Sequence, residues 1–168
     1  MKYILETDRL KLRELTLDDT AFIIELVNSP GWIKYIGDRN IKTEEQAISY
    51  LENGPIKSYH DNGFGLLMVE AKEGKRKIGM CGILKRDTLE HPDIGYALLP
   101  AFTGNGYAFE MAHAVLQYAT IQLKLSTIFA ITVPENMRSI KILEKIGWIF
   151  MKRIQLPNSH EELLLYSN

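Results

Sequence analysis

The hydrophobic positions of the chain follow two different spacings. Residues 9–14 alternate polar and apolar side chains, which is the period of a half-buried strand. Residues 18–28 instead place apolar side chains three and four positions apart, which predicts an amphipathic helix. The same reasoning predicts helices over residues 18–28, 32–36, 43–51, 107–121 and 136–146. It predicts strands over residues 9–14, 65–71, 78–84, 94–99, 127–133, 148–156 and 163–166.

Capping and turn residues mark several ends of these elements. Thr16 and Thr43 each precede a predicted helix and are followed three residues later by Asp or Gln, the spacing of an N-terminal cap. Ser29-Pro30-Gly31 predicts the end of the first helix. In the helix over 107–121, an apolar stripe predicts the face that packs on a sheet: Tyr107, Met111, Ala114, Val115, Tyr118 and Ile121.

The order of the elements predicts an α+β protein in which helices cover a central sheet. The strands over 65–71, 78–84 and 94–99 follow one another and predict an antiparallel meander, so the sheet is expected to be mixed but mostly antiparallel. About seven strands and about four helices in 168 residues predict a single domain over residues 1–168.

Composition excludes several classes of protein. Twenty basic residues against 21 acidic ones give a formal charge of -1, which argues against a dedicated nucleic-acid binder. The one cysteine, Cys81, is expected to be a small buried residue, and no metal site is expected around it. The first nine residues lack the apolar core of a signal peptide, and no run is long enough to span a membrane. We therefore expect a cytoplasmic protein with no nucleic-acid or membrane partner.

A Gly-x-Gly turn between a predicted strand and the helix over 107–121 is the main candidate binding feature. Glycines let a ligand approach the backbone, and the first N–H groups of a helix lack intrahelical partners and attract anions. No Lys or Arg occurs between Arg86 and Lys124, so an anion here would be bound by N–H groups or by cations from elsewhere in the chain. A dinucleotide fingerprint fits poorly because Phe109 stands at its third glycine position, and no Gly-Lys-Ser/Thr follows for a P-loop.

Three segments of the chain share the pattern of a known family. Glu6–Arg13, Asp93–Glu110 and Asn136–Trp148, in this order, resemble the GNAT acyltransferases and in particular the branch of ribosomal-protein N-terminal acetyltransferases. The resemblance implies a GNAT fold whose sheet splays apart between the strands over 94–99 and 127–133. It also implies acyl-coenzyme A as donor, with unpaired groups at those strand edges pairing with the pantetheine amides. The coenzyme would contact Leu98, Leu99, Thr103, Gly104, Asn105, Gly106, Tyr107 and Ala108.

By the same resemblance, the start of the helix over 136–146 would lie at the thioester. Asn136 would contact the pantetheine arm, and Ser139 would lie near the sulfur and donate a hydrogen bond or a proton to the leaving thiolate. Many relatives have a tyrosine where this chain has Leu143, so Ser139 is the expected donor. On local grounds alone, Asn136 also fits an ordinary N-cap and Ser139 a solvated first-turn serine. Ala101 stands where many members have Gln or Arg, which removes one side-chain contact to phosphate.

The other catalytic and acceptor residues follow less directly. A backbone N–H near Tyr96 is expected to stabilise the oxyanion. Asp93 is a candidate base that would act directly or through water. An amine that arrives neutral would need no dedicated base. A polar residue at the start of a strand is also commonly just solvated. The acidic turn over 157–162 would suit a cationic amine. The acceptor site is expected to include Trp32, Tyr35 and Phe64.

Different functions remain compatible with these residues. The first is an enzyme that transfers an acetyl group from acetyl-CoA to a small-molecule amine or a protein N-terminus in a ternary complex, without a metal. Similar proteins are commonly dimers, so a homodimer is possible. The second is a GNAT-fold module that binds acyl-CoA without turnover as a sensor or interaction protein. Ser139 favours the enzyme, whereas Ala101 and the lack of a clear base favour the binding module. The third hypothesis is an unrelated α/β protein in which the glycine turn is purely structural.

Overall fold

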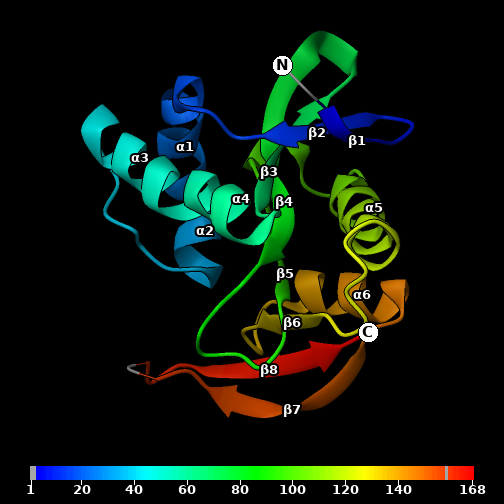
Figure 1. The fold of residues 1–168 in the computed structure, drawn as a ribbon. Helices are drawn as coiled ribbons and strands as arrows, with labels where there is room; N and C mark the ends of the chain where they lie inside the picture. Colours follow the sequence, from blue (N-terminus) through cyan, green and yellow to red (C-terminus); the bar gives the residue numbers. More distant parts are fainter. Residues whose placement is uncertain (1–2, 158) are drawn as a thin grey trace.

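An eight-stranded sheet forms the centre of the molecule (Figure 1). The computed structural model describes residues 3–157 and 159–168. The strand order is β1-β2-β3-β4-β5-β6-β8-β7, and neighbouring strands are antiparallel except β5 and β6, which are parallel. The strands are β1 (Tyr3–Glu6), β2 (Leu10–Glu14), β3 (Leu66–Ala71), β4 (Arg76–Leu84), β5 (Asp93–Leu98), β6 (Phe129–Thr132), β7 (Ile149–Gln155) and β8 (Glu162–Ser167).

Helices cover both faces of the sheet. Figure 1 shows α1 to α4 on one side and α5 and α6 on the other, where α5 packs against β4 and β5. The α-helices of the described residues are α1 (Thr20–Val27), α2 (Pro30–Tyr35), α3 (Glu44–Leu51), α4 (Lys57–Asn62), α5 (Tyr107–Ile121) and α6 (Met137–Ile146). The predicted α+β class and the mixed, mostly antiparallel sheet are confirmed.

Several details differ from the sequence-based expectation. β1 is an eighth strand that the prediction missed, because its four residues are only partly buried at the edge of the sheet. No helix was predicted between residues 52 and 62, yet a π-helical turn over Glu52–Ile56 connects α3 directly to α4. Pro30 begins α2 instead of only ending α1, since proline suits the first turn of a helix. Ile121 was predicted to belong to the core stripe of the helix over 107–121, but it is 73% exposed at the end of α5.

A buried ion pair fixes the first helical layer to the sheet. The guanidinium of Arg13 on β2 donates to both carboxylate oxygens of Asp19 at 2.8 and 2.9 Å, and both side chains are almost completely buried. Glu70 on β3 accepts from the Arg13 Nε at 2.7 Å, and the Lys77 Nζ lies 2.7 Å from Asp19. Burial raises the pKa of Asp19, but the bonds from Arg13 and Lys77 more than offset this and lower it to about 2.

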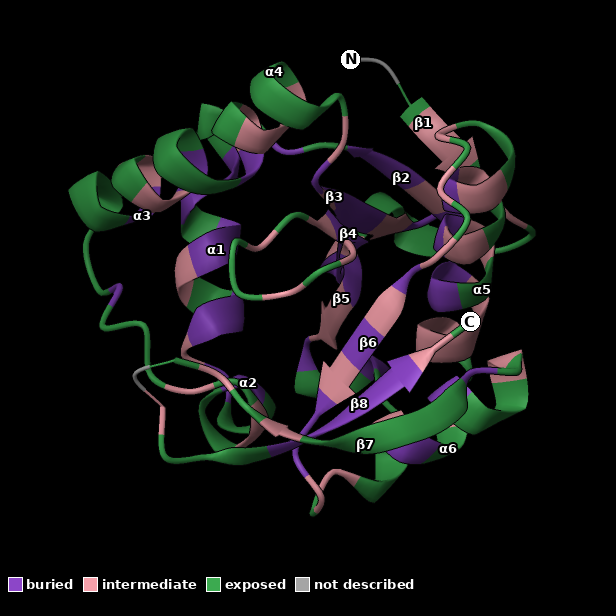
Figure 2. Cartoon of the chain, turned by 60° about the horizontal axis from the view of Figure 1, so that its bottom comes forward, coloured by how far each residue is buried: buried purple, intermediate pink, exposed green. Residues whose placement is uncertain are grey.

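The middle of the sheet allows an unusually close approach between strands. A Cβ on Gly82 of β4 would lie 2.1 Å from the Gly65 carbonyl oxygen, and one on Gly79 would lie 2.2 Å from the Ala97 carbonyl oxygen. Only glycine fits at these two positions, because the neighbouring atoms belong to the backbone. At the other end of the sheet, β7 is an edge strand that Figure 2 shows as largely exposed.

Candidate active site

The parallel pair β5 and β6 diverges after two residue pairs. Only Asp93 with Phe129 and Ile94 with Ala130 are paired, so the C-terminal half of β5 has no partner on this side. The Leu99 N–H donates to the Ile78 carbonyl oxygen of β4 at 2.8 Å. Because N–H directions alternate along a strand, the N–H groups of Tyr96 and Leu98 point away from β4 and into the gap. The predicted splay is therefore present, between the strands where it was expected.

The glycine turn after β5 has the geometry of an anion cradle. Gly104 and Gly106 both have a φ of 80°, and a Cβ on Gly104 would meet no atom within 4 Å. The Thr103 N–H already donates to the Pro100 carbonyl oxygen at 3.2 Å, so it is not available to a ligand. In the part of the chain that the structure describes, the backbone N–H groups of residues 104–108 have no protein acceptor. The cradle is thus formed by residues 104–108, one residue shorter than predicted.

An arginine that the sequence analysis missed holds this turn in place. The Arg9 Nε donates to Glu110 in the first turn of α5 at 2.7 Å, and its Nη1 donates to the Asn105 carbonyl oxygen at 2.9 Å. The Arg9 guanidinium also lies 4.4 Å from the centre of the Tyr107 ring. The Thr7 hydroxyl donates to the same carboxylate at 2.5 Å. Arg9 lies almost 100 residues away in the sequence, so no local pattern could have indicated this contact.

The start of α6 meets β5 through two hydroxyl groups. The Asn136 side chain accepts from the Ser139 N–H at 3.2 Å, which confirms the N-cap interpretation. The Ser139 hydroxyl lies 2.8 Å from the Tyr96 hydroxyl, where either atom can donate. Burial raises the pKa of Tyr96 to about 12, against the opposing effect of the Ser139 bond, so the phenol stays protonated at neutral pH. Leu143 is buried and supplies no hydroxyl.

Asp93 lies apart from this hydroxyl pair. Side chains alternate along a strand, so Asp93 and Tyr96 project from opposite faces of β5. The Asp93 side chain is 1% exposed, and its Oδ1 accepts from the Arg86 Nε at 2.8 Å. Its Oδ2 is buried without a partner among the described residues. Burial raises the pKa of Asp93 although Arg86 opposes the rise, so the carboxylate gains basicity without contacting Tyr96 or Ser139.

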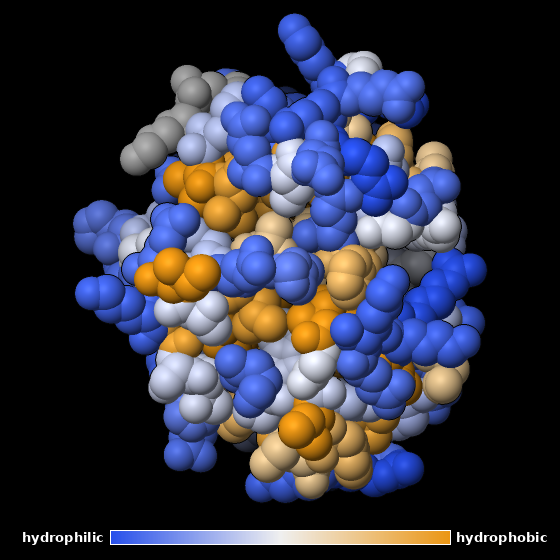
Figure 3. Space-filling model, turned by 90° about the vertical axis from the view of Figure 1, so that its right-hand side faces the viewer, coloured by the Kyte–Doolittle hydropathy of each residue, from blue (hydrophilic) through white to orange (hydrophobic). Residues whose placement is uncertain are grey.

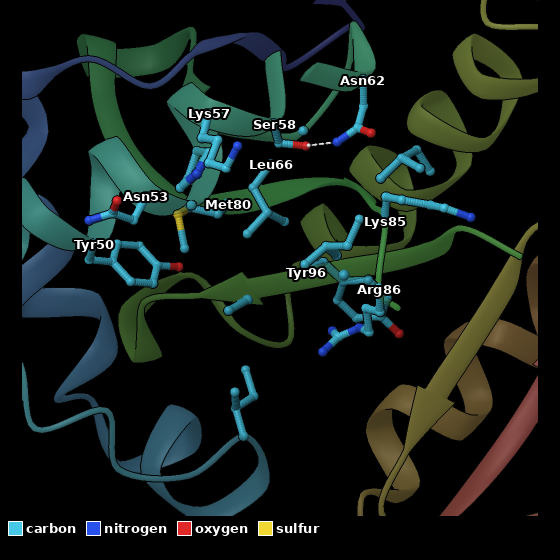
Figure 4. A pocket seen from close by; sticks show the side chains of 18 of the residues that line it. Tyr50, Asn53, Lys57, Ser58, Asn62, Leu66, Met80, Lys85, Arg86 and Tyr96 are labelled. Atoms are coloured by element: carbon cyan, nitrogen blue, oxygen red, sulfur yellow. Dashed lines mark hydrogen bonds between the residues drawn. The ribbon is translucent and has the colours of Figure 1, made fainter. Parts of the chain in front are cut away.

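A cavity of about 380 Å³ lies between β5 and the helical layer of α2 to α4. Figure 4 shows Tyr50 reaching from α3 toward the strands, with Met80 and Leu66 beside it and Tyr96 and Arg86 further along. Its lining includes Gly95, Tyr96 and Ala97, so the cavity reaches the part of β5 that borders the gap. This size and position suit a small acceptor molecule.

Only one of the three aromatic residues expected at the acceptor site lines this cavity. Trp32 is in its wall, whereas Tyr35 is not, and Phe64 lines a separate, much smaller hollow between β3 and α5. The acidic turn over 157–162 is likewise absent from the lining, and Asn158 within it lies outside the described residues. Tyr50 was not predicted, because its spacing in α3 does not distinguish a cavity wall from a core position.

The surface on the α5 and α6 side mixes apolar and charged atoms. Figure 3 looks onto this side and shows hydrophobic residues in patches between hydrophilic ones. The open N–H groups of the gap and the cradle suit a ligand that accepts hydrogen bonds. Over residues 3–157 and 159–168, no group of three or more His, Cys, Asp or Glu side chains is placed to bind a metal. In the same part of the chain, no helix is both long and apolar enough to cross a bilayer.

Comparison with known proteins decides the family. A family model described as an acetyltransferase (GNAT) domain matches residues 9–149. The chain belongs to the GNAT acetyltransferase family. It is 31% identical over 147 residues to a Bacillus subtilis protein described as the uncharacterized N-acetyltransferase YoaA, a match that covers 86% of this chain and 82% of that protein.

Solved structures show the same GNAT fold along the whole chain. The crystal structure of an acetyltransferase from Agrobacterium tumefaciens aligns with 100% of this chain and 94% of its own, with a TM-score of 0.82 and 25% identity. The ribosomal L7/L12 α-N-protein acetyltransferase RimL, solved in complex with coenzyme A, aligns with 99% of this chain and 97% of its own. Its TM-score is 0.84 at 13% identity, a likeness of fold. This GNAT chain is therefore an acetyltransferase with the fold that its sequence indicated.

Proposed function

We propose that this single domain transfers an acetyl group from acetyl-CoA to a primary amine in a ternary complex. The observation that supports this most directly is the coincidence of three open features on β5 and in the turn that follows it. These are the unpaired N–H groups of Tyr96 and Leu98, the unpartnered N–H groups of residues 104–108, and the cavity that reaches Gly95 and Tyr96. The first two suit pantetheine amides and pyrophosphate, and the third suits an amine.

The residues that would hold the coenzyme fit its chemistry. Leu98 borders the gap, whereas the N–H of Leu99 is already bonded to Ile78 of β4, and the cradle offers backbone donors at the positive end of α5. No side chain blocks Gly104. Asn136 retains capacity to accept or donate beside the gap in addition to its capping bond. When bound, acetyl-CoA supplies an activated acyl group whose thiolate is a fairly good leaving group.

The protein's own groups then stabilise charge and deliver a proton. The Tyr96 N–H points into the gap, where it would donate to the oxygen of the attacked carbonyl as negative charge develops. The Ser139 hydroxyl would give its proton to the departing sulfur as the carbon–sulfur bond breaks. The Tyr96 hydroxyl, 2.8 Å away and protonated, can restore that proton to Ser139. Tyr96 and Ser139 thus supply the hydroxyl groups that Leu143 cannot supply.

The attacking amine must be neutral and must lose a proton after attack. Asp93 is a proposed base only through water, since it projects from the other face of β5 and binds Arg86. Its raised pKa favours proton uptake. The named neighbours differ in acceptor: RimL is described as an acetyltransferase of a ribosomal protein, and a Vibrio cholerae SpeG protein as a spermidine N-acetyltransferase. A small amine is the acceptor we propose, because the cavity is bounded by α2 to α4.

Calorimetric titration with coenzyme A tests the donor site. Gly104→Ala places a methyl group in the cradle at a φ of 80°, and Gly63→Ala places one in open space at a φ of 75° at the end of α4. Both variants have the same backbone cost of roughly 1 kcal/mol. We expect at least a tenfold weaker Kd for Gly104→Ala only.

Two results would contradict the proposal. Equal coenzyme affinity in both variants would remove the phosphate site from residues 104–108. Binding without thiol release in the presence of any primary amine would leave a binding module instead of an enzyme. Thiol release is measured with wild-type protein and acetyl-CoA against a panel of amines.

A further inference from the structure

The cavity beside β5 is lined by side chains of predominantly positive charge. Its charged lining residues are four cations and one carboxylate: Arg39, Lys57, Lys85, Arg86 and Asp61. The whole chain has a formal charge of -1, so the cavity has the opposite sign to the molecule. A cationic cavity is unexpected for an enzyme whose acceptor is a positively charged amine, and it requires its own explanation.

The carboxylate of the cavity is already neutralised. Asp61 forms a bond with Lys57 one helical turn away on α4 and another with the neighbouring His60. These bonds hold the pKa of Asp61 below its usual range. The lowered pKa keeps Asp61 ionised, and its negative charge is offset by the positive charge of Lys57 in the ion pair.

The remaining cations differ in their partners. Arg86 is paired with the buried carboxylate of Asp93 at 2.8 Å. Arg39 and Lys85 have no ion-pair partner within residues 3–157 and 159–168. Arg39 lines the cavity together with Tyr50 of α3, and the charge of Arg39 opposes the rise in the pKa of Tyr50 that burial causes. An uncompensated positive charge thus faces the α3 side of the cavity.

Neutral donors also line the cavity. Trp32 is only 7% exposed, and its indole N–H is buried without an acceptor among the described residues. An indole nitrogen can only donate. Figure 4 shows the Tyr50 hydroxyl directed into the space between α3 and the strands, with Asn53 beside it. A buried donor without a partner is costly, so this group of donors indicates a ligand that accepts hydrogen bonds and is negatively charged.

We propose, given the acetyltransferase function above, that the acceptor is a small amine that also has an anionic group, a carboxylate or a phosphate. Arg39, Tyr50 and Trp32 bind the anionic group at the α3 side. The amine then extends toward Tyr96, where the acetyl group is delivered. The positive lining also favours the neutral form of the amine, which is the form that attacks the thioester. A polyamine would be repelled by the same charges.

Matched amines test this charge preference. Alanine and alaninamide differ only in the carboxylate, and aminoethyl phosphate and ethanolamine differ only in the phosphate; spermidine represents a polycation. The kcat/KM of wild-type protein is measured for each by thiol release. We expect the anionic member of at least one pair to exceed its neutral partner by tenfold or more. The pair with the larger ratio identifies the anion as carboxylate or phosphate.

Two variants place the preference in the cavity. Arg39→Gln removes the unpaired cation, and Lys34→Gln removes a nearby exposed cation on α2 that is not in the lining. We expect Arg39→Gln to lower kcat/KM for the anionic amine at least tenfold while coenzyme A affinity stays unchanged. Lys34→Gln should leave both unchanged. An equal effect of the two variants would overturn the assignment of Arg39.

A binding measurement keeps the test independent of turnover. The chain has two tryptophans, and Trp148→Phe leaves Trp32 as the only indole fluorophore. Each amine is titrated against this variant saturated with coenzyme A, and Trp32 emission is followed. Tighter binding of the anionic members supports the proposal. Equal binding of the neutral members, or a preference for spermidine, overturns it; loss of coenzyme binding in wild type would instead refute the acetyltransferase proposal itself.

Discussion

Replacing Asp19 by Asn removes the negative charge from a buried cluster that joins β2 to the first helical layer. Asp19 is 1% exposed and accepts two hydrogen bonds from Arg13, which is itself 2% exposed, and it pairs with Lys77. Breaking a buried ion pair by removing one partner costs about 3–5 kcal/mol. Asn keeps one acceptor oxygen, and Glu70 still binds Arg13, so we take the lower end, about 3 kcal/mol.

Thermal unfolding at neutral pH measures this loss. A protein of this size changes its Tm by about 2–4 °C per kcal/mol, so Asp19→Asn should unfold roughly 6–12 °C below wild type. Asp18→Asn is the matched control, because Asp18 is the preceding residue of the same 3-10 turn and is exposed. Its effect should stay within about 0.5 kcal/mol. Equal Tm values for the two variants would refute the reasoning.

The pH dependence gives a second check on Asp19. Its pKa in the folded protein is lowered to about 2 from an ordinary 3.8. A lowered pKa means that the ionised carboxylate stabilises the fold above about pH 4 and that this contribution disappears as the pH falls toward 2. The stability difference between wild type and Asp19→Asn should therefore shrink over that interval. A constant difference from pH 7 to pH 2 would contradict the assigned charge state.

Three further changes are expected to have distinct effects. Gly82→Ala should destabilise the protein by more than about 3 kcal/mol, because its Cβ would lie 2.1 Å from a backbone oxygen. Gly31→Ala, whose Cβ would lie in open space within α2, should stabilise the protein by about 0.5–1 kcal/mol. Similar denaturation curves for the two variants would contradict both expectations. Ser139→Ala and Tyr96→Phe should each lower kcat about tenfold while coenzyme A affinity is retained. If the two hydroxyls act as a pair, the kcat of the double variant should be about the same as that of each single variant. Additive losses in steady-state kinetics would show that the hydroxyls have separate roles. Glu110→Gln should weaken coenzyme A binding severalfold in calorimetry by releasing Arg9 from the cradle, and an unchanged Kd would show that the cradle keeps its shape without that contact.

Local patterns predicted most of the fold because most elements are determined by local periodicity. The two capping sequences, the apolar stripe of α5 and the alternating strands appear in the structure close to where their spacing indicated. β1 was missed because an edge strand with two exposed ends has no clear alternation. The α3 to α4 connection was missed because a glycine and a proline can also be accommodated by a π-helical turn with Pro55 buried.

In the candidate site, too, features within one continuous segment could be predicted, whereas contacts between distant residues could not. The Gly-x-Gly turn is a continuous segment, so its open backbone N–H groups could be predicted from the sequence, apart from the Thr103 N–H that the preceding turn uses. The contacts of Arg9 with Asn105 and of Tyr96 with Ser139 join residues far apart in the chain. No spacing rule reaches that far. Tyr35 and Phe64 were plausible as aromatic residues, but only the folded chain shows which aromatic side chains border the cavity.

The brief pairing of β5 with β6 has a consequence for the dynamics of the protein. Two residue pairs join the strands β1 to β5 to the strands β6, β8 and β7, and the latter group is continuous in the sequence from Phe129 to Ser167 together with α6. A contiguous segment that shares few backbone bonds with its neighbour can open as a cooperative unit. Amide hydrogens of β6, β7 and β8 should therefore exchange through a common opening at lower free energy than those of β3 and β4. A coenzyme bound across the gap would bridge the two parts and slow that exchange.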